Sequence, residues 1–454
     1  MVTKLFVPPT RAELVHRPGL IELLNNGLNR KLTLLSAPAG FGKTTLVSHW
    51  VEHLQINNEI GGQPIKVAWL SLDGDDNDPV RFLTYLIAAL NQIKDIETKL
   101  GQGALSMLQS PQPPPPNTVL ISLINELAAI PEKIVFVLDD YHLIKEDPIH
   151  QALVFLLENM PPQLHLVIAT RQDPSLSMGR LHARDQVTEI RAADLRFTSS
   201  EAAEFLNQVM GLNLSSRDIA ELETRTEGWV AGLQLAAISM QGRQDREGFI
   251  KSFTGSHRLV LDYLIEEVLV QQPESIQNFL LQTSILNRLT GSLCDALTGR
   301  DNGQQILETL ERANLFIVPL DNERHWYRYH HLFADLLRQH LRQIQLDQIQ
   351  ELHYRASEWY KQNGFTEEAI EHSLRAKDFN RAANLIEELA DDVWQRGEHT
   401  KLRRWLDGLP IESVFSNPYL CILHAWGCFP PVMDELLSGA SKLQSMHLLI
   451  SLHR

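Results

Sequence analysis

The stretch that decides the fold of this chain is KLTLLSAPAGFGKTT, residues 31–45. An apolar run, KLTLLS, leads into a loop that contains Gly40 and Gly42, and a helical pattern, TTLVSHWVEHL, starts at Thr44. A glycine-containing turn between a buried strand and a helix directs several backbone N–H groups and the positive end of the helix dipole toward one place. The spacing therefore predicts a phosphate-binding P-loop. Its residues are Ala37, Pro38, Ala39, Gly40, Phe41, Gly42, Lys43, Thr44 and Thr45.

The polar residues of this loop have distinct predicted tasks. Lys43 is expected to contact the β- and γ-phosphates of ATP or ADP, and the Thr44 hydroxyl to join the coordination shell of Mg²⁺. The pattern G-x-x-x-x-G-K-[ST] has one departure, because Ala37 replaces the first glycine and alanine avoids positive φ angles. The alternative is a chance GKT beside a strand, which the strand before it and the helix after it argue against.

Two further strand ends supply candidate residues. The apolar run IVFVLDD, residues 134–140, ends in two carboxylates. Asp139 is expected to hold Mg²⁺ through water, and Asp140 to polarise the attacking water; because Asp is one methylene shorter than Glu, hydrolysis should be slow. The alternative for the pair is a solvated strand end. Arg171 follows the run LHLVIAT, where an arginine can detect the γ-phosphate or simply form a surface ion pair.

The alternation of apolar runs and helical patterns predicts an α/β P-loop NTPase domain over residues 31–195, after an N-terminal arm over 1–30. Parallel strands are expected at residues 31–36, 66–72, 134–139, 164–170 and 186–190. A helical domain over 196–255 begins at the capping box Thr198 to Glu201. A winged-helix-like module over 256–345 contains one hairpin, with strands at 315–320 and 325–329. Residues 346–454 predict a helical-hairpin superhelix of the tetratricopeptide type, in which Thr366 caps a helix.

Composition limits the classes of function. The chain has 41 basic and 56 acidic residues and a net charge of −15, so it has no general attraction for nucleic acid. Three scattered cysteines fit a reducing compartment without disulfides or a zinc site. The N-terminus has no apolar signal core, and no apolar run approaches 18 residues. We therefore expect a soluble, cytoplasmic protein without a membrane partner.

Seven blocks of the sequence resemble one family, the MalT-like STAND ATPases, which are mostly LuxR-type bacterial transcriptional regulators. In order, they are TKLFVPPTRAELVHRPGL, SAPAGFGKTTL, WLSLDGDDNDPVRFLTYLIAAL, VFVLDDYHLI, IATRQDP, TEGWVAGLQLAA and YRYHHLFADLLR. The resemblance covers about residues 3–425. Alanine at the position of Ala37 is also common in the P-loop of this family.

The resemblance adds expectations for three places in the chain. Arg17 would approach the nucleotide, with Val15 against the base, although both could simply anchor the arm. The segment 228–233 takes the place of the family's Gly-x-Pro motif without its proline, so that either a base contact or plain helix packing is possible. His330 would touch the β-phosphate of ADP and hold a closed form; the alternative is a role in the core.

Family members rest closed with ADP and open when an inducer binds the superhelix and ATP replaces ADP; they then self-associate. Here most of the superhelix and the helix-turn-helix domain that binds DNA are not recognised, which suggests a natural truncation, such as a frameshift near residue 428, or a fragment. The leading hypothesis is a signalling ATPase with slow hydrolysis. The alternatives are a nucleotide-loaded protein scaffold or a non-functional fragment, and a metabolic P-loop transferase, for which no acceptor site is recognised.

Overall fold

A computed structural model describes residues 2–10, 14–57, 59–60, 63–93, 100–110, 114–243, 245–255, 257–344, 348–396 and 398–428. These residues form two compact units. Unit 1 contains the described residues up to Gln271 together with Thr309–Val318 and His330–Phe333. Unit 2 contains Gln272–Glu308, Pro319–Tyr329 and the described residues from Ala334 onward. This division does not follow the predicted boundaries at 255/256 and 345/346, and the five-domain division stays a prediction.

The central element of unit 1 is a six-stranded sheet in the order β2-β3-β4-β5-β1-β6. All strands are parallel except the short edge strand β2. The strands are β1 (Leu32–Ser36), β2 (Glu59–Ile60), β3 (Gln63–Ser71), β4 (Lys133–Asp139), β5 (Leu164–Thr170) and β6 (Val187–Arg191). The five predicted strands are present, with ends that differ by up to three residues; β2 was not predicted. This is the predicted P-loop NTPase fold.

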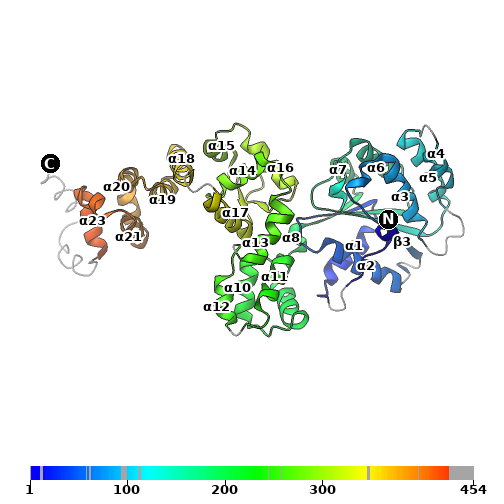
Figure 1. Ribbon diagram of the computed structural model, residues 1–454, viewed down its shortest axis with the longest axis horizontal. Coiled ribbons are helices and arrows are strands. Elements are labelled where there is room, and N and C mark those ends of the chain that lie inside the picture. Colours follow the sequence, from blue (N-terminus) through cyan, green and yellow to red (C-terminus); the bar gives the residue numbers. More distant parts are fainter. Residues whose placement is uncertain are drawn as a thin grey trace. The chain divides into compact units, whose positions relative to one another are not determined.

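The apolar character of the runs explains their central position. Every residue of β1 and β5 is buried, and so are six of the seven residues of β4. Strands covered on both faces need apolar side chains on both faces, and these runs provide them. Figure 1 shows α1 (Pro18–Gly27) and α2 (Lys43–Asn57) on one side of the sheet. The other side carries α3 (Pro79–Leu90), α4 (Gln102–Leu108), α5 (Pro116–Ala128), α6 (Asp147–Asn159) and α7 (Met178–Ala183).

The register brings the carboxyl ends of the strands to one edge. Ser36 at the end of β1 pairs with Thr170 of β5, and Ser71 of β3 pairs with Asp139 of β4. Strand β5 lies between β1 and β4, so the acidic end of β4 approaches the P-loop across one strand. Ligands of open α/β sheets collect at such an edge.

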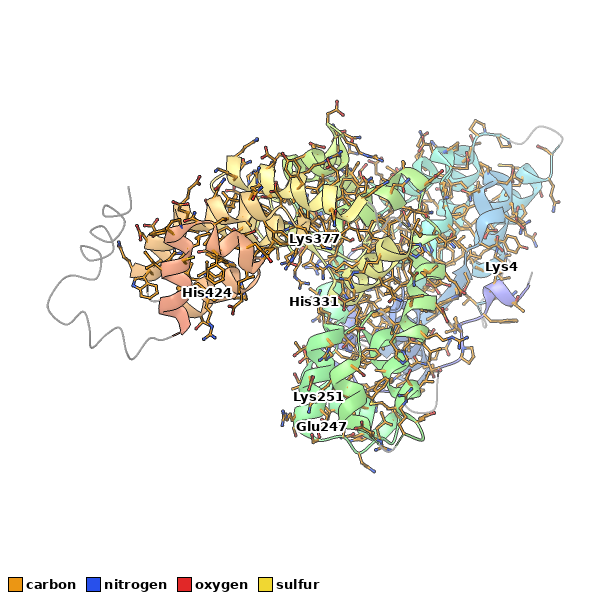
Figure 2. All side chains as sticks on the ribbon, turned by 60° about the vertical axis from the view of Figure 1, so that its left-hand side comes forward. Lys4, Glu247, Lys251, His331, Lys377 and His424 are labelled. Atoms are coloured by element: carbon orange, nitrogen blue, oxygen red, sulfur yellow. The ribbon has the colours of Figure 1, made fainter. Side chains whose placement is uncertain are left out.

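The helical part of unit 1 starts where it was predicted. Thr198 caps α9 (Ser199–Glu204) in a capping box with Glu201. The chain continues through η4 (Phe205–Val209), α10 (Ser216–Thr226) and α11 (Val230–Met240). A further helix, α12 (Arg246–Ser252), was not predicted, whereas α13 (Arg258–Leu264) and η5 (Ile265–Leu269) lie where several helices are expected after residue 256. Glu247 and Lys251, labelled in Figure 2, form an exposed ion pair one turn apart on α12, at 2.8 Å.

The elements that follow are helical apart from one small sheet. The two short strands β7 (Ile317–Pro319) and β8 (Tyr327–Tyr329) form this sheet, where the sequence predicts a hairpin. The helices are α14 (Glu274–Thr283), α15 (Gly291–Thr298), α16 (Gly303–Arg312), α17 (His331–Ile344), α18 (Ile349–Gln362), α19 (Thr366–Ala376), α20 (Phe379–Gln395), α21 (His399–Asp407), α22 (Ile411–Phe415) and α23 (Pro418–Cys428).

One cap prediction in this part is wrong. Thr366 is the first residue of α19, and Phe365 occupies the cap position without a side-chain hydrogen bond. Phe365 instead packs on the ring of Trp359, which stacks with it at an interplanar angle of 9°. The predicted last part of the superhelix, residues 429–454, lies outside the described residues. None of the described helices combines the length and the apolar character that a membrane span needs.

Candidate nucleotide site

The P-loop connects the end of β1 to the first residue of α2, Lys43. Gly40 and Gly42 have φ angles of +76° and +78°, a conformation that residues with a Cβ rarely adopt. Ala37 is not among the described residues with positive φ, and its N–H lies 3.3 Å from the carbonyl oxygen of Thr170. The first position of this loop therefore continues the strand pairing, and alanine fits there without strain.

Lys43 is a buried cation that lies against the loop's own backbone. Its Nζ donates to the carbonyl oxygens of Ala37 at 2.7 Å and Pro38 at 3.0 Å. Burial, followed by the charge of Arg171, lowers the pKa of Lys43 to about 8, and Asp140 and Asp139 oppose the shift. The site thus holds a positive charge that its surroundings neutralise incompletely. An anion placed here would stabilise this charge.

Thr44 and Asp139 meet at the predicted metal position. The Thr44 hydroxyl donates to the Asp139 carboxylate, with oxygen–oxygen distances of 3.0 and 3.1 Å. Burial and the neighbouring Asp140 raise the pKa of Asp139 to about 6. The Thr44 hydroxyl and the Asp139 carboxylate, whose negative charge burial disfavours, fit Mg²⁺ as ligands. This cation takes its remaining ligands from phosphate oxygens and water. The described part of the chain contains no group of three His, Cys, Asp or Glu side chains that could hold a metal alone.

The two other predicted catalytic residues lie beside Lys43. Asp140 has a φ angle of +56° and a side chain that is 44% exposed. Burial raises its pKa, and the charges of Arg171 and Lys43 act in the opposite direction. Arg171 forms an ion pair with Glu267 at 2.9 Å. Arg171 thus forms an ion pair, which was the alternative to a role in phosphate binding. The role of Arg171 as a γ-phosphate sensor stays a prediction.

His142 is a neighbour of these residues that sequence reasoning missed. Its Nδ1 lies 3.8 Å from the Asp140 carboxylate. Burial, followed by the charges of Arg171 and Lys43, lowers the pKa of His142 to about 3, so that the imidazole is neutral near pH 7. The sequence could have indicated this neighbour, because YHLI follows the paired aspartates and places a histidine within three residues of both.

A cavity of about 430 Å³ opens on one side of the P-loop. A volume of this order is typical of small-molecule sites. The loop and α2 line it with Gly40, Phe41, Gly42, Thr44, Thr45 and His49. The N-terminal arm contributes Pro8, Leu14, Val15 and Arg17, and the helical part contributes Phe197, Val230, Ala231, Gln234 and Tyr263. Val15 and Arg17 of the arm and five of the nine predicted loop residues thus border one space; Lys43 and residues 37–39 do not line it.

Arg17 borders this cavity, but its guanidinium is already bound elsewhere. It forms an ion pair with Glu201 at 2.9 Å and donates to the carbonyl oxygens of Asp194, Leu195 and Arg196. These contacts tie the arm to the start of the helical part, which is the anchoring alternative. Val15 is buried and borders the cavity with an apolar surface.

His330 does not border the cavity. Its Nε2 lies 2.9 Å from the carbonyl oxygen of Thr226, so this nitrogen carries the proton, and burial lowers the pKa of the side chain to about 4. The ring packs against those of Trp229 and Phe316. The structure therefore places His330 in a buried ring cluster, and direct contact with the β-phosphate stays a prediction that requires rearrangement of this cluster.

The start of α11 contacts the P-loop directly, which sequence reasoning did not foresee for segment 228–233. The indole N–H of Trp229 donates to the carbonyl oxygen of Ala39, and the backbone N–H of Ala231 donates to that of Gly40, both at 3.0 Å. The segment therefore does more than pack as a helix. The sequence did not predict this role of Trp229, because no local pattern indicates a hydrogen-bond partner that lies 190 residues earlier.

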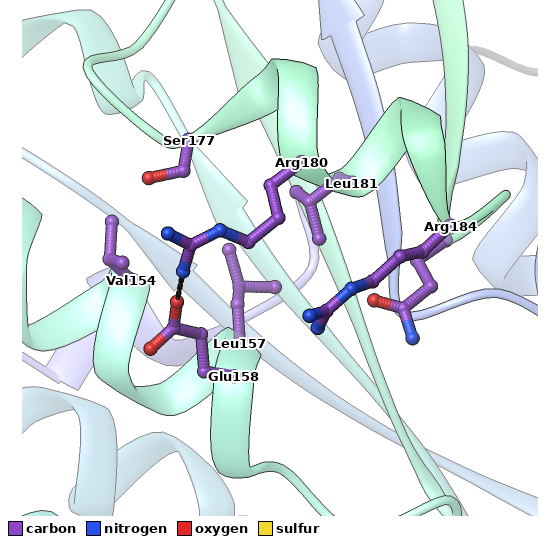
Figure 3. A pocket seen from close by; sticks show the side chains of 8 residues that line it. Val154, Leu157, Glu158, Ser177, Arg180, Leu181 and Arg184 are labelled. Atoms are coloured by element: carbon purple, nitrogen blue, oxygen red, sulfur yellow. Dashed lines mark hydrogen bonds and ion pairs between the residues drawn. The ribbon is translucent and has the colours of Figure 1, made fainter.

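A second, much smaller hollow lies between α6 and α7, where Glu158 and Arg180 form an ion pair (Figure 3). Its volume is about 20 Å³, and its lining includes Val154, Leu157 and Leu181. No predicted site residue lines it. A space of this size holds little more than one water molecule, which excludes a nucleotide. The cavity beside the P-loop is the candidate nucleotide site because Gly40, Gly42 and Thr44 line it.

Comparisons with known proteins agree with this architecture. Residues 31–211 match the model of the NACHT domain, and residues 265–349 match that of the MalT winged helix domain. The HTH-type transcriptional regulator MalT of Yersinia pestis is 36% identical over 426 residues, which are 93% of this chain and 46% of that protein. The chain thus contains a NACHT domain and a MalT winged helix domain and is homologous to MalT.

The chain is also similar to proteins other than MalT. The serine/threonine-protein kinase PknK of Mycobacterium tuberculosis is 35% identical over 413 residues, which are 91% of this chain and 36% of that protein. This MalT-like chain thus spans less than half the length of these two curated relatives. A solved STAND protein with a tetratricopeptide repeat sensor from Pyrococcus horikoshii is 14% identical, covers 92% of this chain and 62% of its own, and has a TM-score of 0.37. The Aeropyrum pernix ORC2 protein is 13% identical, covers 74% and 96%, and has a TM-score of 0.40.

Proposed function

We propose that this chain binds ATP and ADP beside the P-loop and acts as the nucleotide-dependent switch of a MalT-like regulator. The observation that carries the proposal is Lys43, a buried cation that donates hydrogen bonds to the backbone carbonyl oxygens of Ala37 and Pro38. Maintaining a buried ammonium group is costly unless an anion compensates it. The β- and γ-phosphates of a nucleotide in the adjacent cavity are suitable anions.

The remaining residues of the site fit a nucleotide bound with Mg²⁺. Thr44 and Asp139 would hold the metal, which neutralises phosphate charge when it is bound. The cavity offers Val15, Phe197 and Val230 as apolar surface for a base. Asp140 is half exposed beside Lys43 and would orient a water molecule for attack on the γ-phosphate. Its short side chain supports slow turnover, which suits a switch.

The switching step is a shift between populations. ATP together with an inducer must bind an open form better than the closed form, and hydrolysis must restore the ADP-bound closed form. The inducer would bind the helical repeats that start at α18, and the open form would self-associate. In family members a helix-turn-helix domain binds DNA, and the matched residues 31–211 and 265–349 correspond to other domains. The cytoplasmic location that the composition predicts is part of this proposal.

The test is to identify the nucleotide that copurifies with the protein. Denatured protein, analysed by ion-exchange chromatography, should release close to one equivalent of ADP per chain. Steady-state turnover of Mg·ATP should be far below one per second, and light scattering after gel filtration should give a larger particle with ATP than with ADP. Absence of any nucleotide, combined with no heat of binding for ADP or ATP, contradicts the proposal.

A further inference from the structure

Backbone carbonyls of the P-loop accept hydrogen bonds from Lys43, from Trp229 and from the start of α11. Lys43 binds the oxygens of Ala37 and Pro38, the Trp229 indole binds that of Ala39, and the Ala231 N–H binds that of Gly40. Four consecutive carbonyls thus have a donor. Donors that hold successive carbonyls fix the orientation of the peptide planes, and therefore also of the N–H groups that form an anion-binding nest.

The fit between Trp229 and the loop depends on two glycines. A Cβ on Gly40 would lie 2.5 Å from the Cβ of Ala231 and 2.8 Å from the indole nitrogen of Trp229. A Cβ on Gly232 would lie 2.6 Å from the indole ring. Trp229 itself is completely buried. The indole therefore fills a space that leaves no room for a different approach of α11 to the loop.

Trp229 also connects the loop to the segments of unit 1 that come from later in the chain. Its ring lies 5.3 Å from that of Phe316 and 6.1 Å from that of His330, centroid to centroid. Phe316 in turn contacts the ring of Phe41 in the P-loop at 6.2 Å. Residues 309–318 and 330–333 belong to the same compact unit as the P-loop. A movement of these segments would change the packing that holds the indole.

We propose that Trp229, with the backbone N–H of Ala231, is the positioning residue that holds the P-loop in its phosphate-binding shape and couples that shape to segments 309–318 and 330–333. The inference rests on the proposed nucleotide function and adds a residue that does not touch the ligand. The inference assigns the GWVA segment a role in the affinity for phosphate. Other residues of the cavity would contact the base.

The test compares Trp229→Phe with the matched control Trp405→Phe. Phenylalanine keeps most of the ring packing at position 229 but removes the donor to Ala39. Trp405 is also a buried tryptophan, and its indole nitrogen is without a hydrogen-bond partner in the described part of the chain. Calorimetry should show ADP binding about tenfold weaker in Trp229→Phe, unchanged in Trp405→Phe, and adenosine binding unchanged in both. Ala231→Pro, which removes the second donor in the first helical turn, should also weaken ADP binding.

A second readout needs no nucleotide. Amide hydrogen exchange at residues 39–42 of the nucleotide-free protein should be faster in Trp229→Phe than in wild type and in Trp405→Phe. If the wild type does not bind ADP, the proposed function fails, and this exchange measurement still decides the positioning role. Unchanged exchange at residues 39–42, or an equal loss of ADP and adenosine affinity, would overturn the inference, because either result assigns Trp229 to packing alone.

Discussion

At the scale of single residues, the charge of Lys43 dominates the site. Its ammonium group donates to the backbone carbonyl oxygens of Ala37 and Pro38, and burial lowers its pKa to about 8. A phosphate beside it would restore the pKa, and this difference is binding free energy. Lys43→Ala should therefore weaken ADP binding roughly a hundredfold or more, as measured by calorimetry. The control is Lys251→Ala, since Lys251 forms only an exposed ion pair; equal affinities of the two variants contradict the assignment.

Asp139 allows a test that separates metal binding from folding. Because burial raises its pKa to about 6, the ionised carboxylate is less favourable in the folded protein than in the unfolded chain at pH 7. Asp139→Asn should therefore keep or raise the thermal midpoint. The same variant should bind Mg·ATP roughly tenfold more weakly while it binds ADP in EDTA almost as wild type does. A variant with unchanged Mg²⁺ dependence would remove Asp139 from the metal site.

The candidate site was predictable where a local sequence pattern marks the residue. Lys43 and Thr44 follow from the spacing of one loop, and Asp139 follows from the end of one buried run. The contact of Trp229 with Ala39 links residues 190 positions apart, and no periodicity encodes it. Likewise, the guanidinium of Arg17 is bound by backbone carbonyls of residues 194–196, which depends on how the chain folds back. Residue roles that depend on such contacts need the structure.

At the scale of elements, the sheet was predictable and the helical parts were less so. Residues 134–139 and 164–170 are apolar on both faces, a pattern that few structures other than a central parallel strand accommodate. Short helices such as α12 and α13 have seven residues each, too few for a clear periodicity. Thr366 was assigned as a cap because threonine favours that position, but it is the first residue of α19, and Phe365, which precedes it, stacks on Trp359.

The packing of α18 on α19 contains a titratable pair. His353 and His372 are buried with their Nδ1 atoms 2.9 Å apart. Burial lowers the pKa of His353 to about 4, and burial and the neighbouring His353 lower that of His372 to about 3; Arg375 acts in the same direction on both. Between about pH 6.5 and pH 4 the unfolded chain binds protons that the folded helix pair does not. Its stability should therefore fall as the pH decreases through this window.

Hydrogen exchange, corrected for the intrinsic rate, measures this effect locally. The opening free energy of amides in α18 and α19 should be lower at pH 5 than at pH 7. The double variant His353→Leu/His372→Leu removes both titratable groups, so its opening free energy should change much less between these pH values. Equal opening free energies of the wild-type helices at pH 5 and pH 7 would show that the pair does not titrate as its burial implies.

At the scale of the whole molecule, a bound nucleotide should stabilise one of the two compact units and not the other. Every residue that borders the candidate nucleotide cavity belongs to unit 1, and so do Trp229, Phe316 and His330. A ligand stabilises only the parts whose unfolding destroys its site. ADP at a hundred times its dissociation constant should raise the unfolding free energy of unit 1 by about 2.7 kcal/mol. The helices from α18 onward should be unaffected wherever they open independently of unit 1.

Peptide-resolved hydrogen exchange with and without ADP tests this division. Slower exchange is expected in the P-loop, in α11 and in residues 309–318, whereas α20 and α21 should exchange at the same rate in both conditions. Lys43→Ala serves as the control, because added ADP should then protect neither unit. Protection that extends equally to α20 and α21 would mean that the two units open as one cooperative structure. In that case a nucleotide would act on the repeats through global stability, and a switch that requires the repeats to respond separately to an inducer would lose its physical basis.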